Sequence, residues 1–281
     1  MPELPEVETT VRGLSRFLIG ERIASVRLNR PDMRRPFPAN LVQMMTGARV
    51  TGMGRRAKFG LIHTDRDHTM IFHLGMSGRW RIDPELPDAH DHLVITTADH
   101  SFALCDPRRF GWVDWVETGM VDRWPSIASL GPEPLGDALT ADHLHAAFRG
   151  RKQAIKLLLL DQRIVAGLGN IYVCEALHGA RINPRRAGGR VSLAALRRLV
   201  PEIRRVLEQS IADGGSTLRD YARPDGQLGY FATRFQVYGR EGAACLRDAC
   251  EARAHDDDGG GTIRRIEQGG RSTWYCPRCQ R

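Results

Sequence analysis

The sequence lacks any long hydrophobic run. Its uninterrupted apolar stretches, such as Leu157–Leu160, fall far short of the roughly 20 residues that a membrane-spanning helix needs. It also lacks the pattern of a secretory signal, because no apolar segment follows a charged N-terminal stretch. We therefore expect a protein with no membrane partner that works in the cytoplasm.

Cysteine is scarce outside the C-terminal tail. Cys105 and Cys174 lie alone in apolar surroundings, which is typical of buried thiols. Disulfides are unexpected in a chain without export features. The tail holds a C-x4-C pair and a C-x2-C pair separated by a hairpin-length segment, a pattern that suits a tetrahedral zinc site with four thiolate ligands. The sequence therefore predicts one structural Zn²⁺ held by Cys245, Cys250, Cys276 and Cys279.

Acidic residues are fewer than basic ones, 33 against 41, which gives a net charge of +8. A sequence pI near 9.6 favours a polyanionic partner. Basic side chains lie at Arg55–Lys58, and Arg108–Arg109 precede the aromatic Phe110. Lys152 and Lys156 come shortly before a glycine turn that leads into a predicted helix, where backbone N–H groups can bind an anion.

The chain has no internal repeat, and its pattern changes at the Pro/Gly segment 131–136. Before this hinge, helical spacing predicts a helix near 7–18, and β-rich runs predict strands at 23–28, 60–64, 69–74 and 92–96. After it, the sequence predicts helices at 140–148, 152–161, 169–179 and 192–213, followed by a glycine-rich loop at 214–234. The acidic run 256–258 is expected to be a surface insertion.

The N-terminus offers a nucleophile. Removal of Met1 would leave Pro2 as the first residue, with the carboxyl group of Glu3 beside it. An α-amine titrates near pH ~8, against about 10.4 for lysine, so more of it is neutral and able to attack carbon. A secondary amine also forms an iminium that is cationic without a further proton, and Glu3 could supply a proton to a leaving group or opening sugar ring. The alternative is that Pro2 only permits the removal of Met1 and that the acidic residues cap the first helix.

Several motifs together resemble the bacterial formamidopyrimidine-DNA glycosylases, nearly end to end. The resemblance rests on the following segments: 1–8, Arg55–Lys58, His73–Gly78, Asp106–Gly111, Leu130–Leu135, Gly169–Tyr172, Val237–Arg240 and the terminal Cys276-x-x-Cys279. One departure is the first cysteine pair, which is typically C-x2-C in that family and is C-x4-C here.

The resemblance implies an α+β multidomain fold in three parts. The first, at 1–134, is an N-terminal catalytic β-sandwich with a flanking helix. The second, at 135–234, is a helix–two-turn–helix DNA-binding domain that carries a lesion-recognition loop near 217–230. The third, at 235–281, is a C-terminal zinc finger built on a β-hairpin.

The resemblance also implies an activity: excision of oxidised purines from double-stranded DNA by a monomeric enzyme associated with the bacterial nucleoid. Pro2 would be the nucleophile, Glu3 the acid, Lys58 the proton donor for β-elimination, and Arg271 the residue that serves δ-elimination. The implied DNA contacts come from His90, Arg108, Arg151, Lys156 and Asn170, while Met76, Arg108 and Phe110 fill the gap left by the extruded nucleotide.

Two other functions fit the same scaffold. An endonuclease VIII-like enzyme would prefer oxidised pyrimidines, but that branch usually has glycine where this chain has Leu4. A catalytically silent damage-binding protein would have no chemical need for Pro2, Glu3 and Lys58.

Overall fold

The structure, a computed structural model, describes all residues except 1, 217–223, 225, 228, 248–249 and 251–261. The chain forms two compact units: Met1–Ser129 with Ser210–Ala232, and Leu130–Gln209 with Thr233–Arg281. We call them the first and the second unit. In the described part of the chain, no helix combines the length and apolar character needed to cross a membrane.

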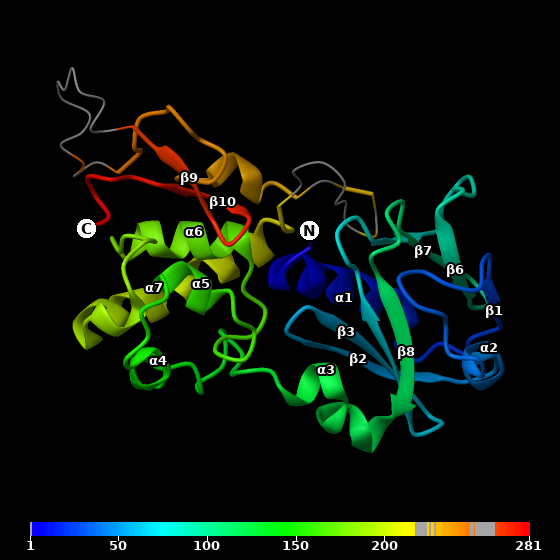
Figure 1. The fold of residues 1–281 in the computed structure, drawn as a ribbon. Helices are drawn as coiled ribbons and strands as arrows, with labels where there is room; N and C mark the ends of the chain where they lie inside the picture. The colour runs from blue at the N-terminus through cyan, green and yellow to red at the C-terminus, as the bar shows by residue number, and fades with distance from the viewer. Residues whose placement is uncertain (1, 217–223, 225, 228, 248–249, 251–261) are drawn as a thin grey trace. The chain divides into compact units, whose positions relative to one another are not determined.

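The first unit is built on two four-stranded antiparallel sheets, with strand orders β1-β6-β7-β5 and β2-β3-β4-β8 (Figure 1). The strands of the first sheet are β1 (Ser25–Leu28), β5 (Arg79–Ile82), β6 (Asp91–Thr96) and β7 (Ser101–Cys105). Those of the second are β2 (Val50–Arg56), β3 (Phe59–Thr64), β4 (His68–His73) and β8 (Trp112–Glu117). The unit also contains the short helices α2 (Leu41–Met45), η1 (Thr118–Arg123) and α3 (Pro125–Ala128), and η3 (Phe231–Arg234) begins in it and ends in the second unit.

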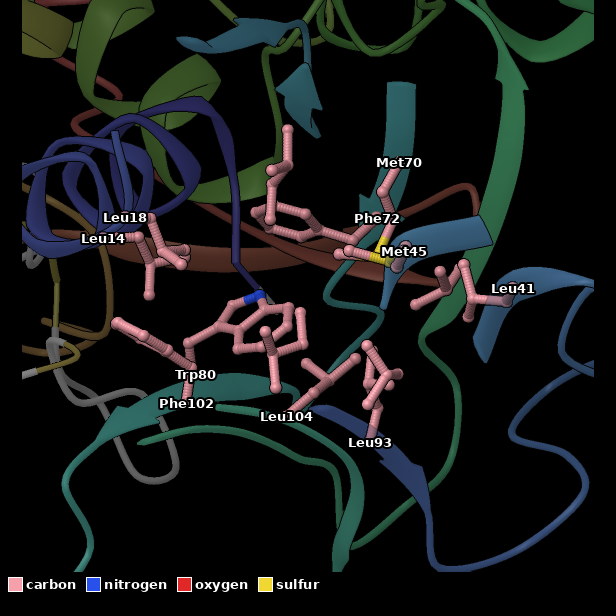
Figure 2. Packing of buried hydrophobic residues seen from close by; sticks show 14 of the residues in the cluster. Leu14, Leu18, Leu41, Met45, Met70, Phe72, Trp80, Leu93, Phe102 and Leu104 are labelled. Atoms are coloured by element: carbon pink, nitrogen blue, oxygen red, sulfur yellow. The ribbon is translucent and has the colours of Figure 1, made fainter. Parts of the chain in front are cut away.

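Helix α1 (Leu4–Leu18) forms because apolar residues recur at helical spacing and bury one face, with Val7, Leu14 and Leu18 each at most 1% exposed. Leu14 and Leu18 pack in one hydrophobic cluster with Phe72 and Trp80, one from each sheet (Figure 2). This cluster is the core of the first unit, and it fixes the start of α1 relative to both sheets.

The second unit contains the helices α4 (Ala141–Phe148), α5 (Ile155–Leu159), α6 (Asn170–Gly179) and most of α7 (Leu193–Ala212), with η2 (Gly188–Arg190) before α7. The hairpin β9 (Arg264–Gln268) and β10 (Arg271–Tyr275) follows. Its turn, Gly269–Gly270, has φ values of 57° and 71°, the left-handed pair that a two-residue hairpin turn requires.

The predicted fold class is confirmed: a sheet domain with a flanking helix, a helical domain and a C-terminal hairpin finger are all present. The four strands and the first helix predicted from the sequence lie within three residues of the observed ones. The predicted helix at 152–161 is shorter in the structure. It begins only after Ala154, which pairs with Ala187 in a short bridge, and it ends before Asp161, whose N–H donates to the Leu158 carbonyl in a turn. The three-domain division at 134 and 234 stays a prediction.

Candidate active site, phosphate-binding groups and metal centre

Pro2 and Glu3 lie at the start of helix α1, and both are buried. The Glu3 backbone N–H donates to Glu6 Oε2 at 2.8 Å, the capping-box contact in which an acidic residue in the first turn satisfies a helix N-terminus. Glu6 Oε1 accepts the Ser216 N–H, also at 2.8 Å. The Glu6 carboxylate therefore holds both Glu3, the neighbour of the predicted nucleophile, and Ser216. Residues 217–223, which follow Ser216, lie outside the described residues.

Lys58 lies in the turn between β2 and β3 and is only 8% exposed. The turn bends at Ala57, whose φ of 52° is in the left-handed region. Arg55 holds it: its Nη1 donates to the Ala57 carbonyl at 2.9 Å, and its Nε donates to Glu8 Oε2 of α1 at 2.8 Å. Burial alone would raise the pKa of Glu8, but hydrogen bonds from Arg55 and Arg12 lower it below its usual value. The first turns of α1 and the Lys58 turn are thus joined by an ion pair.

His73, at the end of β4, shows that the environment is positive. Its ring stacks on Trp112 with centroids 5.7 Å apart, and its Nδ1 accepts the Gly75 N–H at 3.1 Å. Burial, together with the charges of Lys58, Arg34 and Arg35, lowers the pKa of His73 to about 4. A neutral imidazole beside several cations leaves the site's positive charge to lysine and arginine, which suits a phosphate-bearing substrate.

The depressed pKa of His73 predicts a pH dependence of stability. Below about pH 6.5 the unfolded chain binds a proton at this residue that the folded chain does not. The contribution of His73 to the free energy of unfolding is therefore complete above pH 6.5. It is lost as the pH falls towards 4, by up to about 3 kcal/mol. We expect His73→Gln to flatten the fall in unfolding free energy between pH 7 and pH 4.5, measured by urea denaturation. His145→Gln, at an exposed histidine, is the control, and equal flattening in both variants would contradict the assignment to His73.

Asp106 organises a second group of predicted residues in the first unit. Its buried carboxylate accepts the Ser77 hydroxyl at 2.6 Å and the Gly111 N–H at 2.7 Å, and the Arg108 N–H approaches it at 3.3 Å. Its own N–H donates to the His90 carbonyl at 3.0 Å. Through its carboxylate and its backbone N–H, Asp106 therefore ties together the segments that carry Met76, His90, Arg108 and Phe110.

The side chains of this cluster remain exposed. Met76 and Phe110 are each 37% exposed, and the Arg108 guanidinium lies 4.8 Å from the centroid of the Phe110 ring. Gly75 permits the close approach of the two turns: a Cβ on it would lie 2.3 Å from the Phe110 carbonyl carbon, and its φ is 61°. The structure thus brings together the three residues predicted to fill a gap in DNA.

In the second unit, Lys156 and Asn170 both reach the β10 strand. Lys156 Nζ donates to the Ser272 carbonyl at 3.1 Å and to Thr273 Oγ1 at 2.5 Å, and Asn170 Nδ2 donates to the same carbonyl at 2.9 Å. Lys156 is fully buried, so its ammonium is held against the hairpin. Arg271, the first residue of β10, is exposed, as is Arg151 before α5.

The four cysteines of the tail converge. Their sulfur atoms all lie within 4.8 Å of one another, although the first pair has the longer C-x4-C spacing. Four thiolates around one zinc, with bonds of about 2.3 Å, place the sulfurs roughly 3.8 Å apart. The Sγ atoms of Cys245 and Cys279 are 3.9 Å apart, and those of Cys250 and Cys276 are 3.8 Å apart. The residues therefore fit a tetrahedral zinc ion, and the predicted cofactor is confirmed as a four-cysteine zinc site.

Sequence reasoning considered capping of the first helix by its acidic residues only as the alternative to a catalytic N-terminus, and it gave Asp106 no role. Glu6 had a detectable signal, because an acidic residue three positions after Glu3 is typical of a capping box. Asp106 begins one of the segments that carry the family resemblance, but no residue pattern gave it a role in positioning the others. The lesion-recognition loop predicted near 217–230 falls largely outside the described residues.

Comparison with known proteins covers the three parts of the chain. Residues 1–113 match the formamidopyrimidine-DNA glycosylase N-terminal domain, residues 130–222 match the formamidopyrimidine-DNA glycosylase H2TH domain, and residues 260–281 match a zinc finger found in FPG and IleRS.

Full-length relatives and solved structures agree with these matches. The formamidopyrimidine-DNA glycosylase of Erythrobacter litoralis is 73% identical over 281 residues, and that of Novosphingobium aromaticivorans is 65% identical over 282, each with both chains fully covered. The Lactococcus lactis Fpg in complex with abasic-site DNA has a TM-score of 0.89 and 33% identity, with both chains fully covered. The wild-type Lactococcus lactis Fpg with DNA that contains N7-benzyl-Fapy-dG has a TM-score of 0.88 and 32% identity over the same full coverage.

Proposed function

The chain belongs to the formamidopyrimidine-DNA glycosylase family, base excision repair enzymes with glycosylase and abasic-site lyase activity. We propose that it acts on oxidised purines and that its first unit carries base displacement and the first elimination. The observation that supports this most directly is the fixed position of Pro2 and Glu3 at the capped start of α1. The ion pair between Glu8 of α1 and Arg55 holds the turn that carries Lys58, the second acid–base group, against the same helix.

The first step is displacement of the damaged base. Once Met1 is removed, the lone pair of the Pro2 nitrogen attacks the sugar C1′, and the bond from C1′ to the base breaks, with the electron pair leaving on the base. The attacking nitrogen loses its proton and the departing base takes one up, so the nitrogen regains a lone pair. Glu3 then protonates the ring oxygen as the sugar opens, which leaves an iminium between C1′ and the proline nitrogen. Glu3 suits this step because it directly follows Pro2 and its side chain is buried.

The iminium then drives strand cleavage. It withdraws electrons from C2′, so a C2′ proton can leave and the C3′–O bond can break with its electron pair on the phosphate. Lys58 supplies or relays the proton at this β-elimination. Arg271 serves the second elimination, in which the C5′–O bond breaks, and its guanidinium binds phosphate.

The remaining predicted residues bind DNA. We propose that His90, Arg108 and Arg151 contact the backbone near the lesion. Lys156, which is buried against β10, and Asn170 would reach it by exchanging the Ser272 carbonyl for a phosphate oxygen. Met76, Arg108 and Phe110 would occupy the space that the extruded nucleotide leaves. Their contacts would offset the cost of flipping, which is roughly a few kcal/mol. Their exposure and their common attachment to Asp106 support this role.

The zinc ion, bound by Cys245, Cys250, Cys276 and Cys279, supplies structural cross-linking and no reaction step. It fixes the hairpin whose β10 strand accepts hydrogen bonds from Lys156 and Asn170. We also propose the division into domains at 1–134, 135–234 and 235–281, and a monomer that works on nucleoid DNA.

Borohydride trapping tests the activity and the substrate branch together. The protein is incubated with a duplex that carries 8-oxoguanine opposite cytosine, and in parallel with one that carries an oxidised pyrimidine. We expect a covalent band and strand cleavage mainly on the purine duplex. A band only on the pyrimidine duplex would assign the chain to the endonuclease VIII-like branch, and tight binding without a band on either would make it a damage-binding protein.

A further inference from the structure

The second unit contains an arginine-lined hollow that the proposed site does not include. It has a volume of about 710 Å³ and is lined by Asn183, Arg185, Arg186, Ala187, Arg190 and Arg281. The first five residues belong to the segment between α6 and α7. Asn183 donates its N–H to the main-chain oxygen of Arg281 at 3.4 Å, which holds Arg281 beside that segment.

The four arginines of the hollow are exposed, and in the part of the chain that the structure describes none of their guanidinium groups forms an ion pair. Other arginines of the same unit do: Arg163 lies 2.7 Å from Asp161, and Arg205 lies 2.8 Å from Glu202. Four cations around one hollow repel one another, so the arrangement favours an anionic ligand with several charges.

The hollow is joined directly to the segment proposed to bind phosphate. The Ile155 N–H donates to the Arg186 carbonyl at 2.8 Å, and the Gly189 N–H donates to the Arg151 carbonyl at 2.9 Å. A short bridge pairs Ala154 with Ala187. The arginine segment thus continues the surface that presents Arg151, and an extended polyanion bound at Arg151 would meet the hollow next.

We propose that this hollow binds backbone phosphates of duplex DNA beyond those that flank the lesion. The inference rests on the proposed function, because that function makes DNA the polyanion at Arg151. A planar guanidinium group can donate two hydrogen bonds to one phosphate. Because phosphate contacts do not read the bases, the hollow adds affinity that does not depend on base sequence. It thereby extends the length of DNA that the protein grips.

The salt dependence of DNA binding tests this inference. Each neutralised phosphate contributes about 0.9 to the slope of log affinity against log salt, so Arg185→Ala/Arg186→Ala/Arg190→Ala should reduce the slope by roughly 2–3. We expect affinity for a long undamaged duplex to fall ~10-fold or more in low salt, measured by fluorescence anisotropy. The loss of affinity should be smaller on a lesion-bearing duplex that is truncated to the base pairs next to the lesion. The corresponding triple lysine variant, which keeps the charges, should restore most of the slope.

The matched control removes the same net charge elsewhere, with Arg27→Ala/Arg123→Ala/Arg197→Ala at exposed arginines that do not line the hollow. An equal loss in both triple variants would overturn the proposal, as would an unchanged slope in the hollow variant. Binding of inorganic pyrophosphate that depends on the three arginines, with DNA affinity unchanged, would also overturn it. Covalent trapping by the wild-type protein reports the proposed function separately, so the two can fail independently.

Discussion

Replacing Pro2 with glycine is expected to abolish borohydride trapping and strand cleavage, a loss of ~10³-fold or more, which is the scale expected when a nucleophile is removed. Glycine presents a primary amine, whose imine is cationic only when protonated, whereas the proline iminium is permanently cationic. Glycine also frees the backbone at the start of α1, where the Glu6 carboxylate fixes the next residue. Trapping is measured by gel electrophoresis on a duplex with 8-oxoguanine.

Pro5→Gly is the matched control, because it places the same substitution in the first turn of α1 and keeps Pro2. We expect it to lower stability while it retains trapping. Affinity for undamaged duplex should be unchanged in Pro2→Gly, which separates chemistry from binding. Wild-type levels of trapping in Pro2→Gly would remove Pro2 as the nucleophile.

Loss of zinc is expected to weaken DNA binding by ~100-fold or more while the first unit stays folded. The free energy of zinc binding to isolated zinc-finger peptides is about 10–16 kcal/mol, and it stabilises their fold. Without the zinc ion, the four cysteines cannot hold the hairpin in place. The Ser272 carbonyl would then be lost as an acceptor for Lys156 and Asn170. Cys276→Ser and chelation should have the same effect, measured as DNA affinity by anisotropy against bound zinc.

Cys105→Ser provides the control, since Cys105 is a buried thiol of the first unit outside the cysteine quartet. It should keep both zinc and DNA affinity. The unfolding transition of the first unit should survive in Cys276→Ser. Unchanged affinity in fully zinc-free protein would contradict the role given to the hairpin.

Local sequence patterns predicted part of the local structure: in the two four-stranded sheets, β1, β3, β4 and β6 were predicted, whereas β2, β5, β7 and β8 were not. The cysteine spacing predicted the metal centre, and apolar periodicity predicted α1 and four strands. β2 was not predicted, because Gly52 and Gly54 interrupt it and only Val50 is buried. β8 was also missed, although its buried Val113 and Trp115 alternate with less buried residues as a strand pattern should.

The contacts that hold the site could not be predicted from local patterns. Glu6 and Ser216 are 210 positions apart, and Lys156 and Ser272 are 116 positions apart. Such pairs depend on the tertiary fold, which no local period encodes. The family resemblance, by contrast, named candidate residues without showing what positions them. Asp106, which holds the segments of Met76, Arg108 and Phe110, is the clearest example of a positioning residue that it left without a role.

Mass spectrometry of the trapped complex shows whether the N-terminal proline becomes covalently attached to DNA. The borohydride-reduced complex is digested with protease and nuclease, and the modified peptide is sequenced. We predict a sugar remnant on the nitrogen of Pro2, in a peptide that lacks Met1. A remnant on Lys58 or another lysine, with Pro2 unmodified, would contradict the claim.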